Sequence, residues 1–210
     1  FAFCDVLPPT CLQLRNLILS ASRSNLKETD VPEVLSDYMK ELVERNLKPE
    51  VDAYLKSPSL HQNFLVELPQ MLRSSTTGAI NTRLINSLVF YVGVVSVSTN
   101  DSGVKIAVHE LLKAITNNSN AEGRYCILNG IVNHLRFPNA HTTFFRSELL
   151  KLFSEASQEV VQEQITRVLL ERLIARRPQP WGLLVALTEL LKNPMYDFWR
   201  KSFIVNYPEI

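Results

Sequence analysis

The chain has 210 residues, of which 46% are hydrophobic and 20% charged, a composition typical of a soluble globular protein with a substantial core. Twenty-two lysines and arginines balance 21 aspartates and glutamates, and the net charge is +1. This balance excludes an overall electrostatic field that would draw the protein to nucleic acid, an anionic membrane or an acidic substrate. Only six glycines are present, which disfavours folds built on glycine-rich phosphate-binding loops.

The cysteines indicate the cellular compartment, and the start of the chain indicates whether it is a fragment. Cys4, Cys11 and Cys126 are odd in number and form no CxxC pair, which favours a reducing compartment over a disulfide framework or a zinc site. We expect the cytoplasm, with the nucleus as an additional location. Apolar runs are too short for a membrane-spanning helix, so no membrane association is expected. Because Phe1 to Asp5 contain neither an initiator Met nor a basic leader, we interpret the chain as a fragment of a larger protein.

The first 80 residues predict four helices. Thr10 can cap a helix that runs to Ile18, and a second helix is expected roughly over 32–46. A third helix opens at Pro49, and a fourth covers 60–72, where Pro69 should kink or shorten it.

From Asn81 to Lys192, apolar residues recur at three- and four-residue spacing between short polar breaks, which predicts consecutive amphipathic helices. Asn139 is expected to cap one of them, and the preceding helix should end at Arg136 or Phe137, because Pro138 disfavours helical geometry in the residue before it. The expected starts lie near residues 81, 103, 122, 139, 158 and 180.

These starts place a pair of helices in roughly 40 residues, the period of HEAT and armadillo repeats. The sequence therefore predicts an all-α, HEAT-like helical-repeat superhelix of about ten helices, forming a single domain over residues 1–210. No repeat is visible letter by letter, so the spacing alone leaves a compact irregular helical bundle open.

Catalytic and cofactor motifs are absent from the sequence: it contains no GxGxxG, Walker A, HExxH, GxSxG or EF-hand pattern. Cys126 and His134 would lie about 12 Å apart along one helix, too far for a thiol nucleophile and its base. His134 and His141 flank Pro138 and do not share a helical face as metal ligands would. We therefore predict no enzymatic activity, no cofactor and no metal site.

Two surfaces could bind a macromolecule. The first is a basic group, Arg167, Arg172, Arg176 and Arg177, that could contact RNA phosphates, although Glu171 and other acidic residues share the helix and favour a solvated face or a protein contact. Direct binding of nucleic acid is thus the less favoured alternative.

The second surface is the junction around Pro138, where a helix end leaves backbone groups unpaired among aromatic side chains. Ordinary core packing is the competing interpretation, and it is favoured for Phe144 and Phe145 taken individually. The partner-binding residues that we predict are His134, Phe137, His141, Phe144, Phe145 and Trp181.

Several collinear stretches resemble the C-terminal Not1-type domain of the large scaffold subunit of the Ccr-Not mRNA deadenylase complex. The strongest are 128–145 (LNGIVNHLRFPNAHTTFF), 162–174 (QEQITRVLLERLI), 177–184 (RPQPWGLL) and 189–194 (ELLKNP). Weaker ones are 1–9 (FAFCDVLPP), 14–21 (LRNLILSA), 52–57 (DAYLKS) and 85–93 (INSLVFYVG). Gln179 departs from the histidine of the family's RPHPWGLL, and regions 22–51 and 96–116 look shortened and diverged.

The resemblance implies an all-α, HEAT-like scaffold domain without activity of its own. It implies docking of Not2-type and Not3/Not5-type subunits and of short peptides from Nanos-like RNA-binding repressors, in support of mRNA deadenylation, decay and translational repression. It also implies that the chain begins and ends inside the family's domain, so that part of the docking platform lies outside it.

Overall fold

The computed structural model describes residues 33–74, 77–175 and 180–206. Ten α-helices occur in these ranges, together with short 3-10 turns, and the only β feature there is an isolated bridge between Arg73 and Ile80. The helices are α2 (Glu33–Glu44), α3 (Leu47–Lys56), α4 (Gln62–Met71), α5 (Thr82–Ser98), α6 (Ser102–Asn118), α7 (Ala121–Val132), α8 (Ala140–Glu155), α9 (Glu159–Ala175), α10 (Trp181–Lys192) and α11 (Ser202–Val205).

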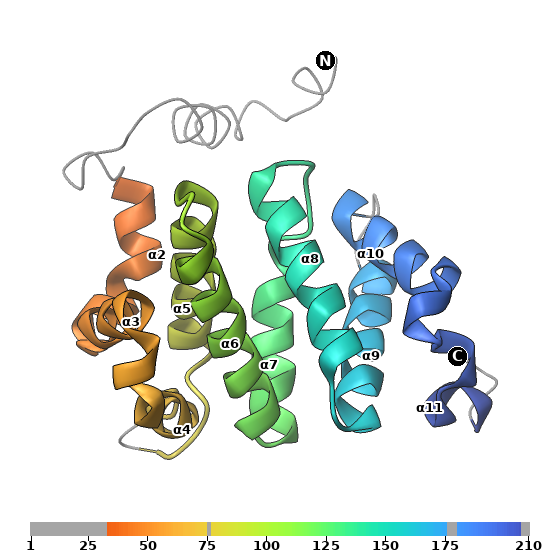
Figure 1. Ribbon diagram of the computed structural model, residues 1–210, viewed down its shortest axis with the longest axis horizontal. Helices are drawn as coiled ribbons and strands as arrows, with labels where there is room; N and C mark the ends of the chain where they lie inside the picture. The colour runs from red at the N-terminus through yellow and green to blue at the C-terminus, as the bar shows by residue number, and fades with distance from the viewer. Residues whose placement is uncertain (1–32, 75–76, 176–179, 207–210) are drawn as a thin grey trace.

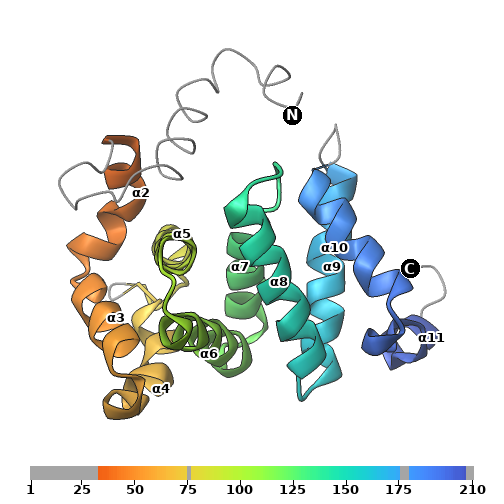
Figure 2. The same cartoon turned by 45° about the horizontal axis from the view of Figure 1, so that its top comes forward.

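The helices form a row that runs from α2 at one end to α11 at the other (Figure 1). Helices α2, α5, α7 and α9 pack in succession, while α6 packs on α3 and α4, and α8 packs on α10. The turned view in Figure 2 shows the same succession of neighbouring helices. This stacking of antiparallel helix pairs is the HEAT-like arrangement that the sequence predicted.

The predicted helix starts from residue 81 onward are confirmed to within one residue. For α5 to α8 the reason is local chemistry at the N-terminal cap, where a side-chain oxygen accepts a hydrogen bond from a backbone N–H of the first turn. Asn81 caps α5, Asp101 caps α6, Asn120 caps α7 and Asn139 caps α8.

A continuous hydrophobic core runs along the row. It is lined by residues at helical spacing, such as Leu88 and Val92 in α5 and Ile127 and Ile131 in α7, all with no exposed surface. The largest fully buried side chains are Phe145 and Phe153 of α8. Helix α8 therefore lies centrally and can position groups toward both α5 and α10.

Two of the predictions concern proline and the ends of α7 and α4. Helix α7 ends at Val132, so the expected end at Arg136 or Phe137 is wrong. The chain tightens there, because the N–H groups of His134 and Leu135 bond to carbonyls only three residues back. Pro69 lies in the last turn of α4, which ends two residues later. The helix expected from Thr10 to Ile18 lies outside the described residues.

Candidate docking surface at the α7–α8 junction

The turn between α7 and α8, residues 133–139, is held by Thr142, which is fully buried. Its backbone N–H donates to the Asn139 side chain at 2.8 Å. Its hydroxyl donates to the carbonyl oxygen of His134 at 2.7 Å and also lies in hydrogen-bonding contact with the carbonyl of Phe137. Two carbonyl groups of the turn are thus satisfied inside the molecule, and the turn has a defined shape.

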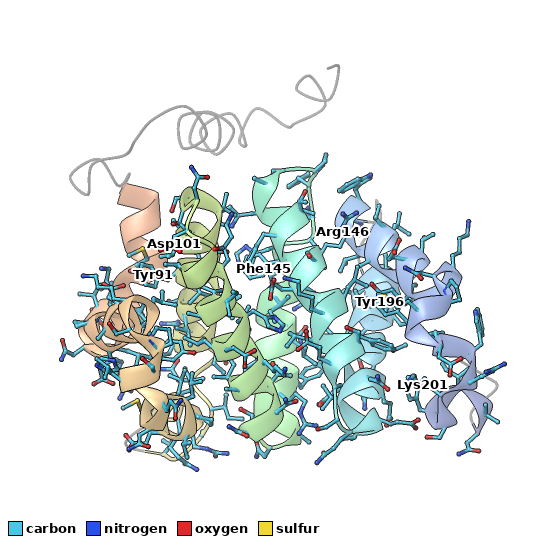
Figure 3. All side chains as sticks on the ribbon, viewed as in Figure 1. Tyr91, Asp101, Phe145, Arg146, Tyr196 and Lys201 are labelled. Carbon is cyan, nitrogen blue, oxygen red and sulfur yellow. The ribbon has the colours of Figure 1, made fainter. Side chains whose placement is uncertain are left out.

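Aromatic rings from three segments meet behind this turn. The His134 ring stacks on the Phe145 ring with 4.5 Å between centroids, and Phe144 packs edge-on against Phe145 at 4.9 Å. Phe90 of α5 lies about 6 Å from both His134 and His141. We call Phe90, His134, His141, Phe144 and Phe145 the aromatic cluster. It ties the turn to α5 and α8 (Figure 3 labels Phe145).

Gly93 makes the close approach of α5 to the cluster possible. A Cβ at this position would lie 2.5 Å from the Phe145 ring and 3.5 Å from His141 Nδ1. Because Phe145 has no exposed surface, its ring has no free space into which to retreat.

Both histidines of the cluster are uncharged at neutral pH. Burial, with a smaller contribution from the neighbouring His141, lowers the pKa of His134 to about 4. Burial also lowers the pKa of His141. The cluster therefore presents an aromatic, neutral face that carries hydrogen-bonding nitrogens without a positive charge.

The six predicted partner-binding residues differ in exposure. Phe145 is fully buried, so it cannot contact a partner, and that part of the prediction is corrected: the ring supports His134 from inside the core. His134, His141 and Phe144 are half-buried. Phe137 and Trp181 keep 38% and 43% of their surface exposed.

Helix α10 begins directly against the junction. A Cβ at Gly182 would lie 2.7 Å from the carbonyl oxygen of Leu135 and 2.6 Å from Thr142 Cγ2. Trp181 precedes this contact by one residue, and Leu184, 44% exposed, follows one helical turn after Trp181. Sequence reasoning missed Leu184, although its three-residue spacing from Trp181 could have indicated it. We define the junction surface as Phe137, Trp181 and Leu184 with the half-buried His134, His141 and Phe144.

The basic group that could have bound RNA is partly committed to other contacts. Arg167 Nε donates to Glu171 at 2.8 Å, and Arg172 Nε donates to Asn129 at 2.9 Å. Tyr125 of α7 also donates to Glu171, at 2.7 Å. The two remaining arginines of that group, 176 and 177, lie outside the described residues. The described part of this face is a network of paired side chains.

Cys126 is poorly suited to act as a nucleophile, because burial raises the pKa of its thiol and disfavours the reactive thiolate. Within the described ranges, His, Cys, Asp and Glu side chains form no group of three or more that could hold a metal ion. No helix of the described part is long and apolar enough to cross a membrane.

An ion-pair network between α6 and α8 was not foreseen from the sequence. His109 Nδ1 bonds to Glu148 at 2.7 Å and its Nε2 bonds to Glu155 at 3.1 Å. Lys151 donates to Glu148 at 2.8 Å, and Lys113 donates to Glu155 at 2.6 Å. We call these five residues the α6–α8 network.

Opposing effects set the charges in this network. The hydrogen bond to Glu148 raises the pKa of His109 against the effect of burial. Burial alone would raise the pKa of Glu148, but hydrogen bonds from His109 and Lys151 outweigh it, and the pKa is lowered. These shifts favour the charged form of both groups, an imidazolium beside carboxylates.

Residues 1–210 match the family described as "CCR4-Not complex component, Not1". The chain is 38% identical to "CCR4-NOT transcription complex subunit let-711" of Caenorhabditis elegans, a match covering all of this chain and 9% of the worm protein. It is 30% identical to "General negative regulator of transcription subunit 1" of Schizosaccharomyces pombe, over 97% of this chain and 11% of that protein. The chain thus spans about a tenth of the length of these relatives.

Solved structures agree with the sequence comparisons. The NOT1 superfamily homology domain from Chaetomium thermophilum is 30% identical with a TM-score of 0.70, over 97% of this chain and 42% of that one. A structure described as "Not1 C-terminal domain in complex with Not4" is 28% identical with a TM-score of 0.64, over 96% and 48%. The chain therefore belongs to the Not1 family of CCR4-NOT complex components.

Proposed function

We propose that this chain is a non-catalytic scaffold domain that docks other subunits of the CCR4-NOT complex through the junction surface. The observation that carries the proposal is the exposure of Phe137 and Trp181 at a turn whose carbonyl groups and aromatic support are fixed from inside. Exposed aromatic side chains on a rigid element contribute binding energy with little ordering cost, and they are the commonest anchors of protein interfaces.

The chemistry of the junction supports a protein partner. The neutral His134 and His141 offer hydrogen-bonding nitrogens beside apolar rings, which suits a mixed apolar and polar protein segment better than a polyanion. The raised pKa of Cys126 likewise speaks against a reactive thiolate at that position.

The comparisons make a subunit of the same complex the natural partner. One related structure is described as a Not1 C-terminal domain in complex with Not4, so a domain of this fold receives a protein. For this chain we propose Not2-type and Not3/Not5-type subunits, and short peptides of Nanos-like repressors, as the partners. In this role the domain supports mRNA deadenylation, decay and translational repression in the cytoplasm.

The test is size-exclusion chromatography of the 210-residue chain mixed with C-terminal fragments of Not2-type and Not3/Not5-type subunits. We expect one earlier-eluting complex. The double variant Phe137→Ala with Trp181→Ala should lose co-elution at micromolar concentrations while its thermal unfolding midpoint stays close to that of the unchanged chain.

The matched control removes two exposed apolar side chains at the other end of the row. Leu60 and Val66 are 80% and 70% exposed, so the double variant Leu60→Ala with Val66→Ala should keep co-elution. Separate elution of the three unchanged components would contradict the scaffold role. Co-elution that survives loss of Phe137 and Trp181 would contradict the junction surface as its site.

A further inference from the structure

A groove of about 260 Å³ opens between α8 and the segment that follows α10. It lies beyond the junction surface along α8, and Figure 3 labels two of its residues, Arg146 and Tyr196, one from each side. Its lining residues are Arg146, Ser147, Leu150, Lys151, Ser154, Glu189, Met195 and Tyr196.

Arg146 is the unusual side chain of this groove. Its Nε is buried and has no hydrogen-bond partner, which is uncommon for a charged donor. The other charged groups of the lining are already engaged: Lys151 donates to Glu148 at 2.8 Å, and Glu189 accepts from Asn193 at 2.9 Å. Arg146 is therefore the lining cation with a donor left unused, beside Lys151, whose ammonium group already donates to Glu148.

Apolar surface lies beside this cation. Met195 is 68% exposed, Leu150 is half-buried, and the Tyr196 ring is buried against Phe153. An arginine guanidinium matches a carboxylate through two parallel hydrogen bonds. A ligand that satisfied both features would carry a carboxylate next to an apolar side chain, as an acidic stretch of polypeptide does.

The charge balance favours a carboxylate over a phosphate. Dianionic phosphate sites and RNA backbones are usually held by several cations, whereas this groove has two, one of them already paired with Glu148, and contains the carboxylate of Glu189. The volume is below that of a drug-sized pocket and accommodates one or two side chains of a chain lying across it.

We propose that this groove docks an extended segment of a partner protein in which an aspartate or glutamate neighbours a large apolar residue. The carboxylate binds the Arg146 guanidinium, and the apolar side chain packs on Met195 and Leu150. The inference concerns a second surface and does not depend on which subunits the junction surface binds.

The experiment begins with a display library of random heptapeptides, from which peptides that bind the 210-residue chain are selected. Enriched peptides should contain Asp or Glu next to Leu, Ile, Met or Phe. A fluorescein-labelled enriched peptide is then titrated by anisotropy, beside its counterpart in which the acidic residue is replaced by Asn or Gln. We expect the neutral counterpart to bind about tenfold more weakly, because a charge-assisted bidentate pair is lost.

Two variants of the chain test the groove itself. Arg146→Gln should weaken binding of the peptide by about tenfold. Met195→Glu places a carboxylate at an exposed position of the groove and should weaken binding by repulsion, so it remains informative if Arg146→Gln folds poorly. Arg83→Gln, at an exposed position of α5, is the matched control and should bind as the unchanged chain does.

Several results would overturn the inference. These are failure to enrich acidic and apolar peptides, equal binding to Met195→Glu, or oligouridine binding that the same variants abolish. Because no Not-type subunit is present in this assay, its failure leaves the proposed scaffold role untouched.

Discussion

The backbone of Gly182 in α10 lies against the backbone of Leu135 in the α7–α8 turn, so closely that a Cβ at position 182 would come within 2.7 Å of the Leu135 carbonyl oxygen. This contact fixes where α10 starts relative to the turn and therefore where Trp181 is presented. A backbone oxygen cannot move aside by changing a rotamer, so the space for α10 depends on glycine at this position.

Gly182→Ala should lower the free energy of unfolding by about 1–3 kcal/mol, the usual range for overpacking, even though alanine is the better helix former. Urea unfolding followed by circular dichroism measures the change. Thr188→Ala, at an exposed position of the same helix, is the control and should leave stability within about 0.5 kcal/mol. Equal stability of the Gly182→Ala protein would mean that the turn can shift freely.

Phe145 and Phe137 should separate stability from binding. Phe145→Ala removes a fully buried ring and should cost about 3–5 kcal/mol. Phe137→Ala truncates an exposed ring and should cost less than about 1 kcal/mol while weakening partner binding. Chemical unfolding and co-elution of the same two proteins provide the comparison, and a Phe137→Ala protein as unstable as Phe145→Ala would place that ring in the core.

Glu148 should be the sensitive member of the α6–α8 network. Glu148→Gln leaves His109 and Lys151 without their shared buried carboxylate and should cost on the order of 3 kcal/mol. Glu155→Gln changes a carboxylate that is 41% exposed and should cost less than about 1 kcal/mol. Thermal unfolding of both variants at pH 7 checks the order, which would be reversed if the exposed pair were the stronger one.

His134 and His109 should show opposite pKa shifts on folding and therefore opposite effects of pH on stability. Because the pKa of His134 falls from 6.5 to about 4 on folding, its contribution to stability is present above pH 6.5 and is lost as the pH falls toward 4, where the unfolded chain binds a proton that the folded chain does not. His109 has a raised pKa, so its contribution is present below pH 6.5 and is lost as the pH rises through its folded pKa. NMR titration of the imidazole Cε1 protons measures each pKa directly, and a normal pKa for His134 would contradict its buried, stacked position.

Much of the fold could be predicted because the helix starts are set by local contacts. Asn81, Asp101, Asn120 and Asn139 each cap a helix through contacts within three residues, so the starts are readable from sequence. The end of α7 could not be predicted, because the tight turn that follows it is held by Thr142 of the next helix, which bonds back to the carbonyls of His134 and Phe137.

The junction surface remains a prediction, and the sequence did not show which of its side chains are exposed. Phe144 and Phe145 are consecutive, and neighbours on a helix point about 100° apart, so one ring faces the core while the other reaches its margin. The buried ring, Phe145, packs against Gly93 of α5, more than fifty residues earlier in the chain. The bonds of the network that connect α6 with α8 join residues 39 to 46 positions apart, and local spacing cannot reveal such pairs.

Lys151 belongs to two structures at once, since it lines the groove and also holds the buried carboxylate of Glu148. An occupant that draws its ammonium group outward would leave His109 as the remaining cation on that carboxylate, and the imidazole would then keep its proton to higher pH. Binding in the groove would thereby change the proton affinity of a histidine in α6, and the titration of that histidine would report whether the groove is occupied.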